Sequence, residues 1–141
     1  MANPKFHHAG FVVRSIQECQ GELAELTGSI AVSETVHDPL QQVNVAFLSY
    51  DAPGASQVEL VEPAGEDCPV QALALRGGGL HHLCYEVDDL EKQLEVAKKK
   101  YAVIVRPPQP AVAFQGRRIA WVMTKHRLLI EYLERTSQKR L

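Results

Sequence analysis

The sequence lacks long apolar runs, an excess of basic residues and a regular cysteine pattern, each of which would place it in a specialised class of proteins. None of its apolar runs approaches the roughly 20 residues that a membrane-spanning helix needs, so we expect no membrane partner. Lys and Arg number 15 against 17 Asp and Glu, for a net charge of -2, and without a basic excess we expect no nucleic-acid partner. The three cysteines, Cys19, Cys68 and Cys84, are an odd set without metal-ligand spacing. We interpret them as free thiols. With the absence of a secretory pattern in the first residues, they favour a cytoplasmic location.

The remaining composition is that of an ordinary globular chain. Of the 141 residues, 45% are hydrophobic and 23% are charged, which is enough apolar material for a compact domain with a core. We therefore expect one domain over residues 1–141.

One pattern occurs twice in the chain. His8 opens an apolar stretch, and Glu59 interrupts another apolar stretch about 50 residues later. His82 and Glu131 repeat this arrangement at a similar distance. Burying an unpaired charge costs on the order of several kcal/mol, so four such residues at matched positions indicate one shared site. Two histidines and two glutamates are a suitable set of ligands for a divalent metal ion.

Each half of the chain shows the same order of elements, namely a strand, a helix and three further strands. In the first half, Ser15 and Glu18 form a capping box at the start of a helix that Gly28 ends. The strands of this half are expected at 6–13, 31–36, 43–50 and 57–61.

In the second half, Asp88 or Asp89 caps a helix that ends in the basic segment 98–100. The expected strands are 82–87, 103–105, 118–124 and 127–133, with 107–110 as a rigid proline-rich loop. This tandem duplication gives a first module at about 5–63, a linker at 64–80, a second module at about 81–134 and a polar tail at 135–141.

The duplicated βαβββ order resembles that of the vicinal oxygen chelate superfamily, which includes glyoxalase I, extradiol dioxygenases and bleomycin-resistance proteins. The segments that carry the resemblance are Val58–Pro63, Gly79–Leu90 and Leu128–Glu131. They are most similar to methylmalonyl-CoA epimerases. The resemblance implies an α+β, glyoxalase-like fold in which tandem βαβββ modules form a cupped, barrel-like mixed sheet around a metal.

By this resemblance the metal ligands are His8, Glu59, His82 and Glu131, and they hold one divalent ion (Zn, Ni, Co, Mn or Fe). Epimerases often have Gln at the position of Glu59. Each histidine is the second of a doubled pair, and because side chains alternate along a strand, the preceding histidines 7 and 81 are expected to point away from the site.

The resemblance also implies chemistry at the carbon next to a thioester or other carbonyl group, with stabilisation of an enolate. Glu131 would be both metal ligand and base. Epimerases use a second glutamate on the opposite side of the substrate, and Leu40 stands at that position here. Asp38 lies on the same face of an extended segment and is our candidate for the second base.

We expect a small-molecule substrate, an acyl-CoA or another carboxylate, and a homodimer. The candidate substrate-binding residues are Gln41 as a neutral donor, Phe47 and Trp121 as lining residues, and Arg117 or Arg118 as an anion clamp. The alternative for the two arginines is a pair of surface charges. For the four ligands, the alternatives are structural histidines and solvated glutamates on edge strands.

Three other functions remain open. The first is a lyase of the glyoxalase I type. The second is a binding module of the bleomycin-resistance type, which sequesters a ligand without chemistry. The third is a dioxygenase, which uses two histidines and one carboxylate.

Overall fold

The computed structural model describes residues 3–52 and 54–135 and divides the chain into two compact units. One unit is His8–His81, and the other combines the residues before His8 with those from His82 onward. The predicted single domain over residues 1–141 stays a prediction. Residues 136–141 of the predicted polar tail lie outside the described residues.

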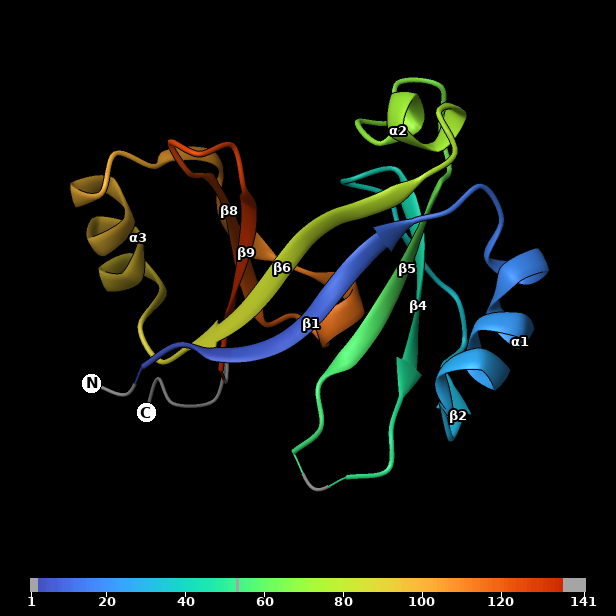
Figure 1. Cartoon of the computed structure of the whole chain (residues 1–141). Helices are drawn as coiled ribbons and strands as arrows, with labels where there is room; N and C mark the ends of the chain where they lie inside the picture. The colour runs from blue at the N-terminus through green and yellow to red at the C-terminus, as the bar shows by residue number, and fades with distance from the viewer. Residues whose placement is uncertain (1–2, 53, 136–141) are drawn as a thin grey trace. The chain divides into compact units, whose positions relative to one another are not determined.

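The unit His8–His81 contains a mixed sheet with strand order β2-β4-β5-β1, and β3 also pairs with β4 (Figure 1). Strand β1 runs parallel to β5, whereas β4 is antiparallel to its neighbours. The elements are β1 (Lys5–Val12, shared with the other unit), α1 (Ile16–Thr27), β2 (Ala31–Val32), β3 (Val36–Asp38), β4 (Val43–Ser49), β5 (Gln57–Pro63) and α2 (Gln71–Leu75).

In the other unit the strand order is β6-β9-β8-β7. Strand β6 runs parallel to β9, and the other two pairings are antiparallel. The elements are β6 (Gly79–Val87, which begins in the first unit), α3 (Leu90–Lys99), β7 (Val103–Pro110), the short 3-10 helix η1 (Val112–Phe114), β8 (Arg118–Met123) and β9 (Leu129–Glu134). The predicted α+β class, the βαβββ order and the mixed sheet are confirmed.

The caps of both long helices follow from the local sequence. The Ser15 hydroxyl accepts a hydrogen bond from the Glu18 N–H at 3.2 Å, and α1 ends at Gly28, whose φ is 73°. At α3, Asp89 is the cap, because its carboxylate accepts from the Lys92 N–H at 3.0 Å. Asp88, the other candidate, forms an ion pair with Arg135 instead.

Each helix covers one face of its own sheet. Ile16 of α1 packs with Ala46 and Leu60, which lie on β4 and β5. In the second unit, α3 packs on the equivalent strands through a cluster of buried residues: Val87, Leu90, Leu94, Ala97, Ala120, Val122 and Tyr132. Ala46 and Ala120 have no exposed surface, and small side chains at these positions let the helix approach the sheet closely.

Two predicted boundaries are wrong. The proline-rich segment 107–110 is part of β7 rather than a loop, and it pairs with β8 as far as Pro110 opposite Arg118. Strand β7 lies at the edge of its sheet, where prolines are tolerated because only one side of the strand is hydrogen-bonded, and its pairing with β8 shifts register between Arg106 and Gln109. The predicted strand 31–36 is divided into β2 and β3, because Ser33 between them bonds to the backbone of Phe47 through both its N–H and its hydroxyl.

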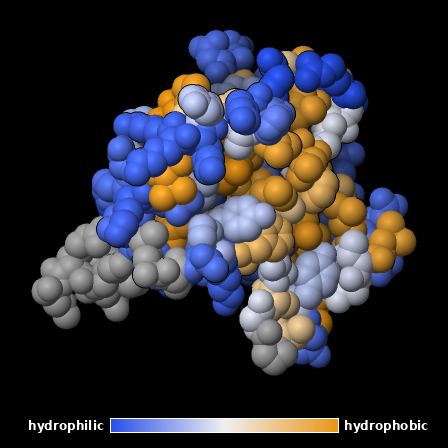
Figure 2. Space-filling model, turned by 60° about the vertical axis from the view of Figure 1, so that its left-hand side comes forward, coloured by the Kyte–Doolittle hydropathy of each residue, from blue (hydrophilic) through white to orange (hydrophobic). Residues whose placement is uncertain are grey.

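Apolar side chains also reach the surface, where orange residues stand among blue hydrophilic ones (Figure 2). They include Val103 and Val105 on the edge strand β7. Within residues 3–52 and 54–135, no helix combines the length and the apolar character needed to cross a bilayer.

The neighbouring glycines Gly77 and Gly78 are expected to differ in how well each tolerates substitution by alanine. Both have positive φ, 109° at Gly77 and 82° at Gly78, but a Cβ on Gly78 would lie 2.2 Å from the Val12 carbonyl oxygen, whereas a Cβ on Gly77 would meet nothing within 4 Å. We expect Gly78→Ala to lower the free energy of unfolding by about 1 to 3 kcal/mol more than Gly77→Ala, because a backbone contact must shift. Urea denaturation of both variants measures this difference. Equal losses would show that backbone strain alone decides the cost.

Candidate functional site

In the unit His8–His81, strand register brings a histidine and a glutamate together. Glu59 on β5 lies opposite Gly10 of the parallel strand β1, and His8, two residues before Gly10, projects from the same face. The His8 Nε2 and Glu59 Oε1 atoms are 3.3 Å apart. His8 has no exposed surface and Glu59 only 6%, so both are interior polar groups.

The other unit repeats this arrangement. Glu131 on β9 lies opposite Cys84 of the parallel strand β6, and His82 is two residues before Cys84. The His82 Nε2 and Glu131 Oε1 atoms are also 3.3 Å apart, and both residues are buried. Strands β5 and β9 each lie inside their sheet, so the alternative of solvated glutamates on edge strands is wrong.

An aromatic ring packs against each of these histidines. Phe47 of β4 lies opposite Glu59, and its ring packs edge-on against the imidazole of His8, with 5.4 Å between the ring centroids. Trp121 lies opposite Glu131 on β8, and its ring meets that of His82 at 4.7 Å. The two predicted lining residues therefore hold equivalent places beside the two imidazoles, where they restrict ring rotation.

The donor atoms of each pair suit a shared metal ion. Protein nitrogen and oxygen ligands bind transition metals at about 2.0 to 2.2 Å, so two adjacent ligands of one ion lie about 3.0 to 3.4 Å apart. The separation of 3.3 Å in both pairs falls in this range. Imidazole and carboxylate are also the ligand types that zinc, nickel, cobalt, manganese and iron accept.

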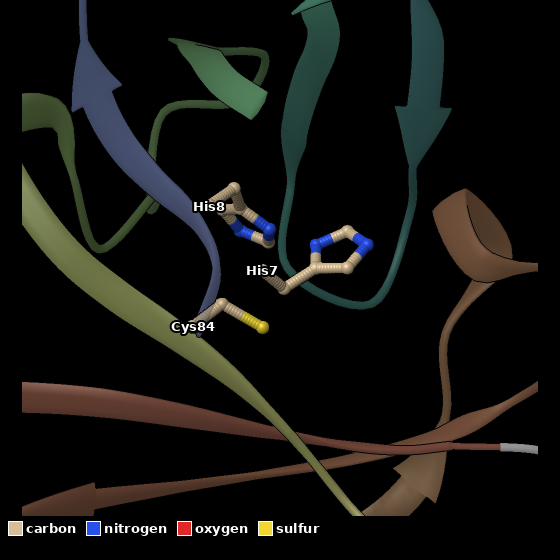
Figure 3. A group of neighbouring side chains, drawn as sticks. All are labelled: His7, His8 and Cys84. Carbon is tan, nitrogen blue, oxygen red and sulfur yellow. The ribbon is translucent and has the colours of Figure 1, made fainter. Parts of the chain in front are cut away.

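The doubled histidines have opposite environments, as strand alternation predicts. His8 and His82 are buried, whereas His7 and His81 are only partly buried. Figure 3 shows His7 and His8 as consecutive side chains on β1, together with Cys84 on β6. A ring nitrogen of His7 lies within 4.8 Å of the Cys84 sulfur, a proximity that the sequence pattern did not indicate.

Asp38, our candidate second base, is buried and organises the turn that follows it. One of its carboxylate oxygens accepts hydrogen bonds from the N–H groups of Leu40 and Gln41, at 3.0 and 3.1 Å. The other accepts from the Gln41 side-chain amide at 2.8 Å. These bonds hold the Gln41 amide in place and leave Leu40 exposed.

The two arginines proposed as an anion clamp pair with carboxylates of their own unit. Arg117 donates to Glu86 at 3.0 Å. Arg118 donates to Glu91 through two nitrogens, at 2.8 and 2.9 Å, and to Glu134 at 2.7 Å. The hydrogen bonds to Glu134, followed by those to Glu91, raise the pKa of the Arg118 guanidinium. A substrate-binding role for either arginine stays a prediction.

Comparison with known protein families identifies the class. The family model described as "Glyoxalase/Bleomycin resistance protein/Dioxygenase superfamily" matches residues 7–121 of the chain. The chain belongs to this superfamily.

The chain is also similar to individual proteins. The chain is 29% identical over 134 residues to "Uncharacterized protein YqjC" of Bacillus subtilis (strain 168), covering 92% of this chain and 91% of the relative. It is 30% identical over 98 residues to "Methylmalonyl-CoA epimerase, mitochondrial" of Homo sapiens, covering 68% of this chain but only 53% of the human protein. The crystal structure of methylmalonyl-CoA epimerase from Mycobacterium tuberculosis has the same fold, with a TM-score of 0.79 and 23% identity over 94% of this chain and 88% of that one.

The hydrogen bonds of Arg118 to Glu91 and Glu134 are expected to stabilise the fold by a measurable amount. Glu134 is only 2% exposed, so Arg118→Ala would take the guanidinium from a buried carboxylate. We expect the free energy of unfolding to fall by about 2 kcal/mol. Urea denaturation measures the change, with Arg76→Ala at an exposed position as the control. An Arg118→Ala variant as stable as the wild type would contradict a structural role and favour the anion clamp.

Proposed function

We propose that this protein is a divalent-metal-dependent enzyme similar to methylmalonyl-CoA epimerase, with one ion held jointly by His8, Glu59, His82 and Glu131. The observation that carries the proposal is the repeated buried pair, with the same strand register and the same 3.3 Å separation in both units. A single buried histidine beside a carboxylate is compatible with a purely structural role. Two equivalent pairs in a duplicated chain supply four ligands of the types that one transition-metal ion accepts.

When bound, such an ion supplies Lewis-acid stabilisation of negative charge that develops on a substrate carbonyl oxygen. The chain's own residues would do the rest. Glu131 removes a proton from the carbon next to the carbonyl and returns it. The aromatic rings of Phe47 and Trp121, which lie beside the histidines, keep the imidazoles oriented.

The surroundings of Asp38 favour a single base. Its two oxygens already accept three hydrogen bonds from Leu40 and Gln41, and Leu40 has no group that transfers a proton. A single base acts on one face of the substrate only. We therefore propose rapid exchange of the substrate proton by Glu131, with Asp38 holding the Gln41 amide toward the substrate, and inversion would require a further proton donor.

Metal content tests the shared site. We expect purified wild-type protein to carry about one divalent ion per chain, and His8→Ala, His82→Ala and Glu131→Ala each to reduce metal affinity at least about tenfold, because each removes a ligand. His126→Ala, which changes an exposed histidine in a turn, is the control. Inductively coupled plasma mass spectrometry after loading with Zn, Ni, Co, Mn or Fe measures the stoichiometry.

Two other outcomes of this measurement would contradict the proposal. Two ions per chain, with His8→Ala losing only one of them, would mean that each pair binds its own ion. Wild-type protein that takes up no ion under any loading condition would favour a ligand-binding module of the bleomycin-resistance type.

Deuterium exchange tests the base. We expect wild-type protein to incorporate deuterium from D2O into methylmalonyl-CoA, detected by mass spectrometry, and Glu131→Gln to slow this exchange by about 100-fold or more because a general base is lost. Glu59→Gln makes the same change at the equivalent position of the other unit. It should retain exchange, since an amide oxygen can still bind a metal. Asp38→Asn should also retain exchange, and its loss in a folded Asp38→Asn variant would contradict the assignment of Glu131 as the single base.

We also propose that the protein is located in the cytoplasm and forms a homodimer. Size-exclusion chromatography with light scattering measures the oligomeric state directly.

A further inference from the structure

A surface cavity of about 360 Å³ lies within the unit His8–His81, and the proposed chemistry does not use it. Its lining residues are Arg14, Pro63, Gln71, Ala74 and Leu75. Arg14 follows β1, Pro63 ends β5, and the other three belong to α2. The volume is within the range of small-molecule sites, about 300 to 1,000 Å³.

Arg14 brings a positive charge to this cavity. Its Nε donates to the Ala74 carbonyl oxygen and its Nη2 to the Leu75 carbonyl oxygen, both at 3.3 Å. These two bonds orient the guanidinium and leave its other N–H groups for a ligand. With the residues that the structure describes, Arg14 forms no ion pair.

The neighbouring carboxylate is engaged elsewhere. Glu62, next to Pro63 on β5, accepts hydrogen bonds from the Ile16 N–H at 2.8 Å and from the Asn44 side chain at 2.9 Å. The charge of Arg14 is therefore available to an external anion. A guanidinium with several N–H groups in one plane matches the oxygens of a phosphate group.

We propose that this cavity binds a phosphate group, with Pro63 and Leu75 as the apolar wall for the rest of the ligand and the Gln71 amide as an additional polar contact. The ligand class is a phosphate monoester that carries a flat or apolar part, such as a nucleotide.

Under the proposed function, on which this step rests, the phosphate belongs to the nucleotide end of an acyl-CoA substrate. The parallel strands β1 and β5 both run from the His8 and Glu59 pair toward the cavity. Pro63 is four residue steps along β5 from Glu59, about 13 Å at the rise of an extended strand. An acyl-CoA places a flexible pantetheine arm between its thioester and its phosphates, and such an arm can cover this distance.

Isothermal titration calorimetry with adenosine 3′,5′-bisphosphate tests the site without any activity. We expect wild-type protein to bind it and Arg14→Gln to bind it about tenfold more weakly, because one charge-assisted contact is lost. Arg14→Lys, which keeps the charge, should be affected less, and Arg76→Gln, at an exposed arginine beside α2, should bind like the wild type. Thermal unfolding of each variant confirms that it is folded. No binding by wild-type protein, or equal binding by folded Arg14→Gln, would overturn the phosphate site and leave Arg14 as a cap of α2.

Kinetics with two substrates identify the source of the phosphate. If it belongs to the substrate, Arg14→Gln raises KM for methylmalonyl-CoA about tenfold but leaves kcat, and the KM for methylmalonyl-pantetheine, unchanged. If bisphosphate binding is lost while both KM values stay at wild-type levels, the cavity serves a separate phosphorylated ligand and the acyl-CoA assignment is wrong. A chain without activity toward methylmalonyl-CoA would contradict the proposed function, and the calorimetric test of the cavity would still stand.

Discussion

The structure of each unit depends on the burial of an imidazole beside a carboxylate in the middle of a sheet. An isolated carboxylate in such a place is strongly unfavourable, and it is tolerated only with a partner that is held in position. Parallel pairing of β1 with β5, and of β6 with β9, supplies that position. A shift of either register by one residue would turn the glutamate to the opposite face, against the helix.

This constraint explains why each sheet must be covered on the face away from the histidines. The residues that flank Glu59, such as Leu60, point toward α1 and form the apolar core of their unit. Their counterparts beside Glu131 form the core against α3. The same strands thus carry an apolar core on one face and a polar pair on the other.

The ionisable side chains of the protein differ in the groups to which they are hydrogen-bonded. Arg117 and Arg118 form several bonds to carboxylates and carbonyls of their own unit, an arrangement that stabilises a fold. Among the residues that the structure describes, Arg14 bonds to carbonyl oxygens and to no carboxylate, which keeps its net charge available. Burial raises the pKa of the Cys19 thiol, which lowers its reactivity and agrees with a small apolar role in the contact between α1 and its sheet.

The sequence by itself determined the order of elements, the superfamily and the two His–Glu pairs, because a duplicated pattern of apolar runs with matched polar interruptions is visible without coordinates. It also identified Ser15 as the cap of α1 and left only Asp88 and Asp89 as candidates for the second cap. Tertiary structure decided the rest. The proline-rich segment 107–110 became a strand because β7 lies at a sheet edge, which a local pattern does not reveal. Arg117 and Arg118 acquired their partners, and Arg14 joined the cavity at α2, only through contacts between residues distant in the chain. Strand periodicity fixes the face of a side chain, but the chemistry of its neighbours depends on which segments the fold brings together.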